Sequence, residues 1–366
     1  MTEDYAMITI RYLEPFEKDK TLPLWKESFP EDKPQFLDYY YKEKTKDNRI
    51  LVAQETNFGQ TRIISMLHRN PYRLWVHGQM IDSDYIVAVA TAVDKRHQGL
   101  MRHLLTQMTI DMYQEGMPFC YLMPADPKIY EPFGFAYIYD QEHWQLKDQA
   151  KAQLTRQRVS LCDVKTISEW LNQWLMKHYE IFAFRDEAYI KRLMLELESE
   201  EGWLEFLYDN TKNLVGIQSW WGVDKAEQRM LLCEEQYREA EKDASPAIMV
   251  RIVHLEHCLE LLHLHSSCPI DEMEVILDVK DTFCPQNQGT FLWKLDKQAS
   301  KLSRQDEIKP SLSANYRINL DISVLTQWIF GYQDLPECSV ITPPGEVDNW
   351  LQSIAVWKNI FLDEIV

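Results

Sequence analysis

Short apolar runs alternate with amphipathic stretches along the first 145 residues. The runs have the length and the β-branched and aromatic composition of strands, and the stretches between them carry apolar residues at helical spacing. Strands that alternate with helices predict an α/β sheet domain. The strand-like runs are Met7–Tyr12, Arg49–Gln54, Ile63–His68, Tyr85–Val93 and Phe119–Leu122.

Residues 146–245 form a second mixed segment. Helical patterns precede two strand-like runs that a turn joins, and a charged stretch ending at Pro246 marks the predicted boundary. The expected elements are helices at Ile167–Met176 and Glu187–Leu197, and strands at Trp203–Tyr208 and Leu214–Trp221.

Residues 246–366 form a third segment. Its first part is predicted to be a helix, because apolar residues recur at helical spacing at Ile252, Leu255, Leu259 and Leu262. Beyond it we expect strands at Glu274–Val279, Thr290–Leu295 and Tyr316–Leu320, and a helix at Ile322–Ile329.

Charge and composition narrow the classes of partner. The chain has 57 acidic and 39 basic residues, a net charge of −18, which repels nucleic acid and attracts small cations. No apolar run reaches the ~18–20 residues of a membrane-spanning helix, and the first thirty residues lack the pattern of a signal peptide. The seven cysteines contain no CxxC pair, as is usual in a reducing compartment. We therefore expect a soluble cytoplasmic protein without nucleic-acid or membrane contact.

The stretch from Asp84 to Met112 carries the clearest chemistry. A nearly continuous apolar strand runs into a turn that contains Gly99, and an amphipathic helix follows. Free backbone N–H groups and the helix dipole make such a helix N-terminus a site for phosphate, although a plain strand–turn–helix has the same pattern. The stretch contains neither a P-loop nor a dinucleotide fingerprint.

Two motifs in this region resemble those of the GNAT-type N-acetyltransferases. Arg96-x-x-Gly99-x-Met101 is similar to their pyrophosphate loop, with Met101 in place of a small final residue. Downstream, Tyr130-Glu131-Pro132-Phe133-Gly134-Phe135 resembles the Y-x-x-x-G-F element that follows the fifth strand of that fold.

The resemblance extends to the enhanced intracellular survival (Eis) branch over nearly the whole chain. The stretches that carry it are Ile248–Val253, Leu277–Trp293, Phe330–Tyr332 and Phe361–Val366. It implies a mixed α/β (α+β) fold with a catalytic GNAT domain at 1–145, a second, non-catalytic GNAT-like domain at 146–245, and a sterol carrier protein-like domain at 246–366. Family precedent also implies a homo-oligomer.

The resemblance assigns the donor site to acetyl-CoA and requires no metal. It gives the acyl carbonyl and pantetheine to backbone groups at the end of the fourth strand, and the pyrophosphate to the turn and helix that follow. These positions are Val89, Ala90 and Thr91, then Arg96, His97, Gln98, Gly99, Leu100, Met101 and Arg102, with Ala125 and Asp126 at the next turn.

Two further residues have catalytic roles in the family. Tyr130 matches the general acid, since a phenol with pKa near ~10 can return a proton to a thiolate whose conjugate acid has a pKa near ~8.5. The C-terminal carboxylate, here that of Val366, matches the general base. An ordinary α-carboxylate has a pKa of about 3.3–3.7, so it would need desolvation, a water relay or a role limited to orienting the amine.

The acceptor site is expected after the first strand. Its candidate residues combine aromatic rings with carboxylates, which suits a cationic amine, although an amphipathic surface helix has the same composition. They are Trp25, Phe29, Glu31, Asp32 and Phe36.

The predicted function is direct acetyl transfer to a primary amine of an aminoglycoside, a polyamine or a lysine-like acceptor. The alternatives are a catalytically silent CoA- or lipid-binding regulatory protein and an oligomeric scaffold. A zinc site could be drawn from His254, His257, His263, His265 and nearby cysteines, but their spacing is not diagnostic and we expect no metal.

Overall fold

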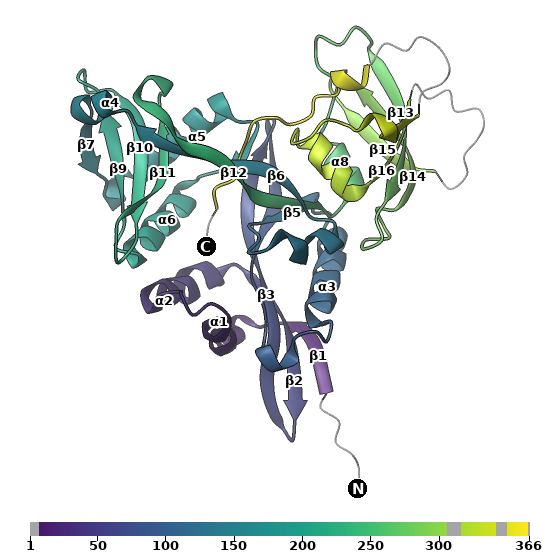
Figure 1. Cartoon of the computed structure of the whole chain (residues 1–366), viewed down its shortest axis with the longest axis horizontal. Coiled ribbons are helices and arrows are strands. Elements are labelled where there is room, and N and C mark those ends of the chain that lie inside the picture. The colour runs from purple at the N-terminus through teal and green to yellow at the C-terminus, as the bar shows by residue number, and fades with distance from the viewer. Residues whose placement is uncertain (1–6, 306–315, 342–349, 365–366) are drawn as a thin grey trace.

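The computed structural model describes residues 7–305, 316–341 and 350–364 (Figure 1). A long twisted sheet forms the centre of the molecule, with strands in the order β1-β2-β3-β4-β5-β12-β6, and β8 pairs with both β3 and β18. These strands are β1 (Met7–Tyr12), β2 (Arg49–Asn57), β3 (Gln60–Val76), β4 (Gln79–Thr91), β5 (Phe119–Leu122), β6 (Ala136–Leu146), β8 (Ile181–Ala183), β12 (Arg238–Ile252) and β18 (Ile360–Phe361).

Helices cover both faces of the N-terminal part of this sheet. Helices α1 (Leu22–Ser28) and α2 (Pro34–Glu43) pack on one face, against Ile50 and Val52 of β2. Helix α3 (Leu100–Gln114) packs on the opposite face, against Leu51 and Ala53 of the same strand. Because successive side chains of a strand point to opposite faces, a strand buried on both faces is a continuous apolar run.

The middle segment has its own sheet, with strands in the order β11-β10-β9-β7. The helices α5 (Val164–His178) and α6 (Glu187–Ser199) share one apolar core with it, and α4 (Asp148–Gln153) precedes it. The strands are β7 (Thr155–Arg158), β9 (Trp203–Tyr208), β10 (Leu214–Trp221) and β11 (Glu227–Cys233).

The third segment folds around a sheet in the order β15-β14-β13-β16-β17. Its core is continuous with that of the central sheet, since Phe119 of β5 lies edge-on to Phe330 with ring centroids 5.1 Å apart. The elements are α7 (Leu255–Leu259), β13 (Glu272–Lys280), β14 (Gly289–Asp296), β15 (Ser300–Arg304), β16 (Tyr316–Asp321), α8 (Ile322–Ile329) and β17 (Val340–Ile341).

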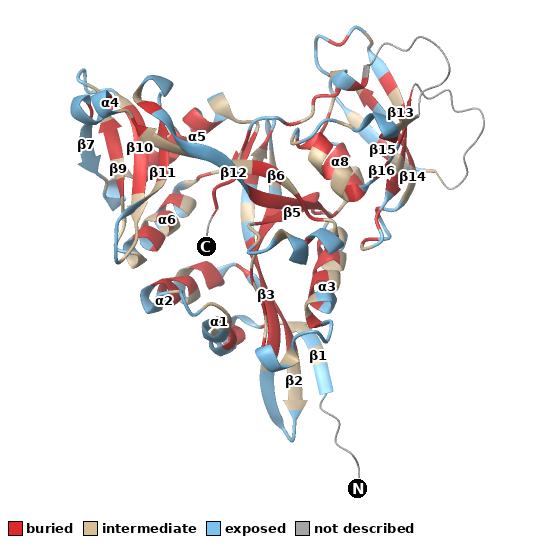
Figure 2. Cartoon of the chain, viewed as in Figure 1, coloured by how far each residue is buried: buried red, intermediate tan, exposed pale blue. Residues whose placement is uncertain are grey.

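Strand β12 corrects two expectations. The predicted boundary at Pro246 falls inside this strand, and the predicted helix through Ile252 is instead the end of β12 followed by the short helix α7. The first half of β12 is exposed and charged, whereas residues 247–252 are buried between β5 and β6 (Figure 2). A short apolar run buried on both faces has no alternation that would distinguish a strand from a helix.

The length and hydropathy of the helices bear on whether any of them could span a membrane. Among the residues that it describes, no helix is both long and apolar enough to cross a membrane.

Candidate active site

Strand β4 contains a bulge at the position where the donor site is predicted. Met66 of β3 pairs with Ala90 and His68 pairs with Val87, so that Ala88 and Val89 both lie opposite the single residue between Met66 and His68. Ala88 has a φ of 52°, in the left-handed region that a residue with a Cβ occupies at a cost of roughly 1–2 kcal/mol. Such bulges bend a strand and are frequent beside active sites.

Beyond this bulge, the edge of β4 that faces β5 is open. The two parallel strands pair only at Tyr85 and Tyr121, although β4 continues to Thr91. Val89, Ala90 and Thr91 therefore have backbone groups on this side that no β5 residue pairs with. An open strand edge can hydrogen-bond an extended ligand that carries amide groups.

The open edge leads to the N-terminus of α3. Gly99 precedes the helix with a φ of 78°, and a Cβ built there would meet no heavy atom within 4 Å. Leu100 is buried and Met101 packs toward the core on the α3 face of the sheet, so the Met101 side chain does not fill the turn. The exposed side chains around the turn are those of Arg96, His97, Gln98 and Arg102.

Unpaired amides of the first turn and the positive end of the helix dipole make this turn suitable for an anion. Arg96 donates from Nε to the carbonyl of Thr91 at 3.2 Å, which joins the turn to the end of β4. Ala125 and Asp126 are exposed after β5, and Asp126 accepts a hydrogen bond from the Lys128 amide at 3.0 Å.

Tyr130 lies between the short 3-10 turns η4 (Pro127–Ile129) and η5 (Glu131–Phe133). Its side chain is buried on the α3 face of the sheet, edge-on to Phe135 with ring centroids 5.8 Å apart. Burial raises the pKa of its hydroxyl to about 12. The hydroxyl therefore keeps its proton at neutral pH.

The C-terminal segment of the fold holds the Tyr130 turn in place. Gly134 follows the turn with a φ of 78°, and a Cβ there would lie 2.1 Å from Nη1 of Arg251. Arg251 is buried in β12 and its Nη2 pairs with Oδ2 of the buried Asp281 at 2.5 Å. In addition, Phe283 lies edge-on to Phe133 at 5.0 Å.

The loop after Asp281, with Cys284, Pro285 and Asn287, lies within the Leu277–Trp293 stretch that carries the resemblance. Oδ1 of Asp281 accepts from the Cys284 amide at 2.9 Å, and Asn287 accepts at Oδ1 from the Leu255 amide at 3.0 Å. The second bond joins the loop to α7, and the Arg251–Asp281 pair joins it to β12, so this stretch has a structural role beside the Tyr130 turn.

The C-terminal tail is anchored between the central sheet and the middle segment. Strand β18 pairs in parallel with β8, and the buried Asp363 forms ion pairs with Arg185 and Arg229. Val366, the predicted base, lies outside the described residues.

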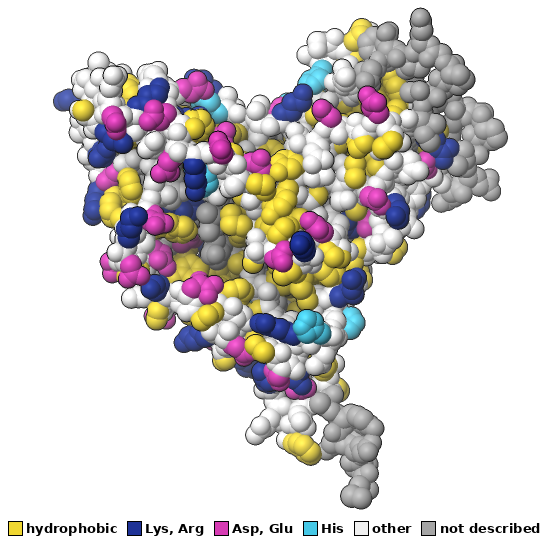
Figure 3. Space-filling model, viewed as in Figure 1, with side chains coloured by type: hydrophobic (Ala, Val, Ile, Leu, Met, Phe, Trp, Pro, Cys, Tyr) yellow, Lys and Arg dark blue, Asp and Glu magenta, His cyan; other side chains and the backbone are white. Residues whose placement is uncertain are grey.

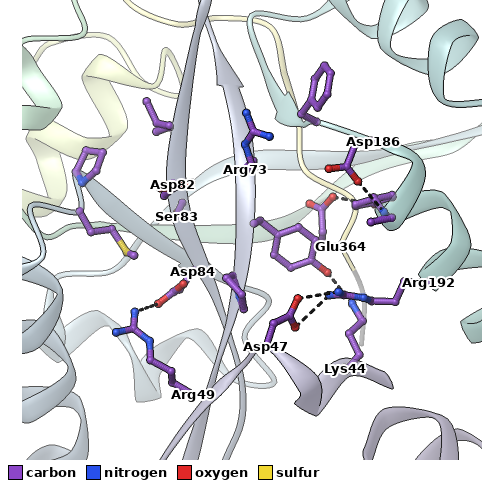
Figure 4. Close-up of a pocket in the computed structure, with 18 of the residues that line it drawn as sticks. Lys44, Asp47, Arg49, Arg73, Asp82, Ser83, Asp84, Asp186, Arg192 and Glu364 are labelled. Carbon is purple, nitrogen blue, oxygen red and sulfur yellow. Dashed lines mark hydrogen bonds and ion pairs between the residues drawn. The ribbon is translucent and has the colours of Figure 1, made fainter. Parts of the chain in front are cut away.

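A cavity of about 780 Å³ lies between β3, β4, α6 and the tail (Figure 4). Glu364 forms part of its wall between β3 and α6 and is 2 % exposed. Burial and the neighbouring carboxylate of Asp363 raise the pKa of Glu364 to about 7. Glu364 is not among the residues predicted from the sequence, where its signal is a pair of acidic residues within an otherwise apolar tail.

The predicted acceptor residues lie elsewhere. Trp25 and Phe36 are buried in the core between α1, α2 and the sheet, and Trp25 donates from Nε1 to Asp32 at 2.6 Å. Phe29 packs edge-on to Trp25 at 5.6 Å, and Glu31 is exposed. The structure brings Trp25, Phe29 and Asp32 together, but none of the five lines the 780 Å³ cavity.

The histidines considered for zinc pack with other groups. His254 stacks on His257 at 3.7 Å, and Nδ1 of His257 lies 2.7 Å from the carbonyl oxygen of Gly116. Within residues 7–305, 316–341 and 350–364, no three His, Cys, Asp or Glu side chains are placed to hold a metal ion.

Comparison with known proteins identifies two domain families in the chain. Residues 9–138 match the acetyltransferase (GNAT) domain, and residues 258–341 match the sterol carrier protein domain. Among curated proteins, none matches the chain significantly by sequence.

Solved structures share the fold over nearly the full length. A conserved Enterococcus faecalis protein, described as a probable N-acyltransferase, superposes with a TM-score of 0.75 at 15% identity, over 93% of this chain and 94% of that one. The GCN5-related N-acetyltransferase of Kribbella flavida gives a TM-score of 0.72 at 15% identity, over 99% of both chains.

Eis1 of Mycobacterium abscessus gives a TM-score of 0.67 at 12% identity, over 98% of this chain and 100% of that one. At these identities the likeness concerns the fold. The chain therefore contains a GNAT acetyltransferase domain and a sterol carrier protein domain, within a fold that it shares over nearly its full length with these solved structures.

Proposed function

We propose that this protein transfers an acetyl group from acetyl-CoA directly to a primary amine of a small cationic acceptor. The observation that carries the proposal is the geometry of β4, where the bulge at Ala88 and an open edge lead into the N-terminus of α3. Tyr130 completes the arrangement with a protonated hydroxyl on the next turn.

The residues along this path fit the parts of the donor. Backbone N–H groups of Val89–Thr91 suit the amides of an extended pantetheine arm, and the α3 turn with Arg96 and Arg102 suits a pyrophosphate. Hydrophobic side chains gather over the middle of the molecule, near β5 and β6 (Figure 3), which suits the apolar parts of that arm. When bound, the donor supplies a thioester carbonyl as the electrophile.

Tyr130 is the proposed general acid. The amine nitrogen forms a bond to the thioester carbonyl carbon while the carbon–sulfur bond breaks toward sulfur. Tyr130 donates its proton to that sulfur and regains one from the nitrogen, so its hydroxyl is unchanged after each turnover. A thiol has a pKa near ~8.5, below the pKa of about 12 of the Tyr130 hydroxyl, so the phenol gives up its proton only as it receives the proton that the nitrogen loses on forming the amide.

Charge supports a cationic acceptor. Seven carboxylates, among them Asp82, Asp186 and Glu364, and five Lys or Arg side chains line the 780 Å³ cavity, and the net charge of the chain is −18. Such a field raises the local concentration of cations. Polyamines, aminoglycosides and lysine-like amines are the acceptors to test first. The resemblance gives the base role to the α-carboxylate of Val366, which the experiments below test separately.

The test is release of free thiol from acetyl-CoA against a panel of these amines, with water as the control. We expect turnover with at least one amine, and a fall in kcat of about 10²-fold or more in Tyr130→Phe. The KM for acetyl-CoA should stay the same, because Phe keeps the ring packing. Tyr208→Phe, in β9 of the middle segment, is the matched control and should keep full activity.

Two results would contradict the proposal. Unchanged kcat in Tyr130→Phe would exclude Tyr130 as the acid. No turnover with any amine, together with a clear rise in melting temperature on adding CoA, would favour a silent CoA-binding regulatory protein.

A further inference from the structure

The wall of the 780 Å³ cavity includes the buried carboxyl group of Glu364, one oxygen of which has no hydrogen-bond partner among the described residues. Oε1 of Glu364 accepts from the Tyr189 hydroxyl at 3.2 Å. Among the described residues, Oε2 has no hydrogen-bond partner, although it is shielded from solvent. A buried carboxyl oxygen without a partner is costly, and a ligand that donates a hydrogen bond would remove that cost.

Other buried acidic groups along the cavity wall already have partners. Glu196 accepts from the Tyr39 hydroxyl at 3.1 Å and lies 3.7 Å from Nζ of Lys44. Asp84 pairs with Arg69 at 2.7 Å. Glu364 is therefore the buried carboxyl group of this wall that is available to a ligand.

Groups from every neighbouring element act on Glu364. The tyrosine hydroxyls are neutral at neutral pH, Arg185 and Arg229 favour its ionised form, and Asp363 opposes it. The titratable groups within electrostatic reach are Lys44 of η2 (Lys44–Lys46), Tyr72 of β3, Tyr85 of β4, Tyr121 of β5, Tyr139 of β6, Arg185, Tyr189 of α6, Arg229 of β11 and Asp363.

We infer that Glu364 binds the ammonium group of the acceptor in this cavity and takes the proton that makes the amine a nucleophile. The inference rests on the proposed function and names the Glu364 side chain as its base. The ionised carboxylate accepts one proton from the ammonium nitrogen, whose electron pair then forms the bond to the acyl carbon. Glu364 later releases that proton to solvent, so one proton leaves per acetyl group transferred.

The environment of Glu364 suits proton abstraction from an ammonium group better than that of an ordinary, solvated carboxylate. A base is most effective when its pKa lies near the working pH, and burial places Glu364 in that range. Tyr189 fixes the orientation of one oxygen, which leaves the other free to meet the ammonium.

The first test measures amine binding without acetyl-CoA. Titration calorimetry with 1,4-diaminobutane and spermidine at pH 7, in two buffers of different ionisation enthalpy, reports both affinity and protons released. We expect Glu364→Gln to weaken binding by about 10-fold or more and to abolish proton release. Glu205→Gln, in β9 outside this cavity, should keep both. Equal affinity and equal proton release in Glu364→Gln would overturn the inference.

The second test separates Glu364 from the α-carboxylate. The native kcat/KM for the amine should rise with pH through the neutral range, and Glu364→Gln should lose that inflection while keeping its CoA-induced rise in melting temperature. One glycine added after Val366 moves the α-carboxylate and should leave the inflection in place. An inflection that persists in Glu364→Gln but is lost when the glycine is added would assign the base to the α-carboxylate. If the native protein turns over no amine, the proposed function fails, whereas the calorimetry still decides on Glu364.

Discussion

The buried pair Arg251–Asp281 gives the sharpest prediction on stability. Both side chains are almost fully buried, with 0% and 1% exposed, and the pair joins β12 to the loop that supports the Tyr130 turn. In Asp281→Asn the Arg251 guanidinium stays buried without its counter-charge. In Arg251→Met it is the Asp281 carboxylate that stays buried without a counter-charge. Breaking a buried pair in this way costs about 3–5 kcal/mol, so each variant should lose about that much free energy of unfolding.

The double variant tests whether the cost comes from the unpaired charge. In Arg251→Met with Asp281→Asn neither charge remains, so the loss should be well below the sum of the two single losses, with a coupling of at least about 2 kcal/mol. Asp271→Asn breaks an exposed ion pair with Lys297 in the same segment and should cost less than about 1 kcal/mol.

Urea-induced unfolding, followed by tryptophan fluorescence, measures these differences. We expect Asp281→Asn also to lower kcat, because Nη1 of Arg251 lies against Gly134 and a displaced guanidinium would move the turn. Additive losses in the double variant, or a loss below about 1 kcal/mol in Asp281→Asn, would refute the reasoning.

Four further predictions follow from single residues. Glu364 has a pKa of about 7 in the fold against an ordinary value of 4.5, so the native protein holds this proton more tightly than the unfolded chain and loses stability as pH rises between these values. From pH 5 to pH 8 the free energy of unfolding of Glu364→Gln should therefore rise by up to about 3 kcal/mol relative to that of the native protein, as measured from urea midpoints. A difference between the two proteins that does not change with pH would contradict this. Ala88→Gly removes the cost of a positive φ and should raise or preserve the melting temperature, unlike glycine in an ordinary strand. Gly99→Ala should cost about 1 kcal/mol of stability and raise the KM for acetyl-CoA, measured by thiol release; an unchanged KM would place the pyrophosphate elsewhere. Asp363→Asn should lower kcat without changing CoA affinity, because Arg185 and Arg229 lose the carboxylate that anchors the tail; CoA affinity is measured by calorimetry, and full activity would show that the tail needs no anchor.

Local patterns in the sequence determined many of the elements, including the strand, turn and helix of the proposed donor site. Strands β1, β5, β9 and β10 and helix α8 have the predicted bounds, because each is a short apolar run limited by turn residues. The turn at Gly99 was predicted for the same reason. A strand, a glycine and an amphipathic helix are consecutive in the chain, so their geometry follows from neighbouring residues alone.

Tertiary structure decided the features that combine distant residues. The bulge at Ala88 follows from the register between β3 and β4, which apolar composition does not define. Strand β12 joins the central sheet only because β5 and β6 accept it on both sides. The Arg251–Asp281 pair joins β12 to a loop 30 residues further along the chain. The environment of Glu364 combines side chains from all three parts of the chain. Burial sets the charge state and the free hydrogen-bonding capacity of such groups, and burial is a property of the packed molecule that no single stretch of sequence contains.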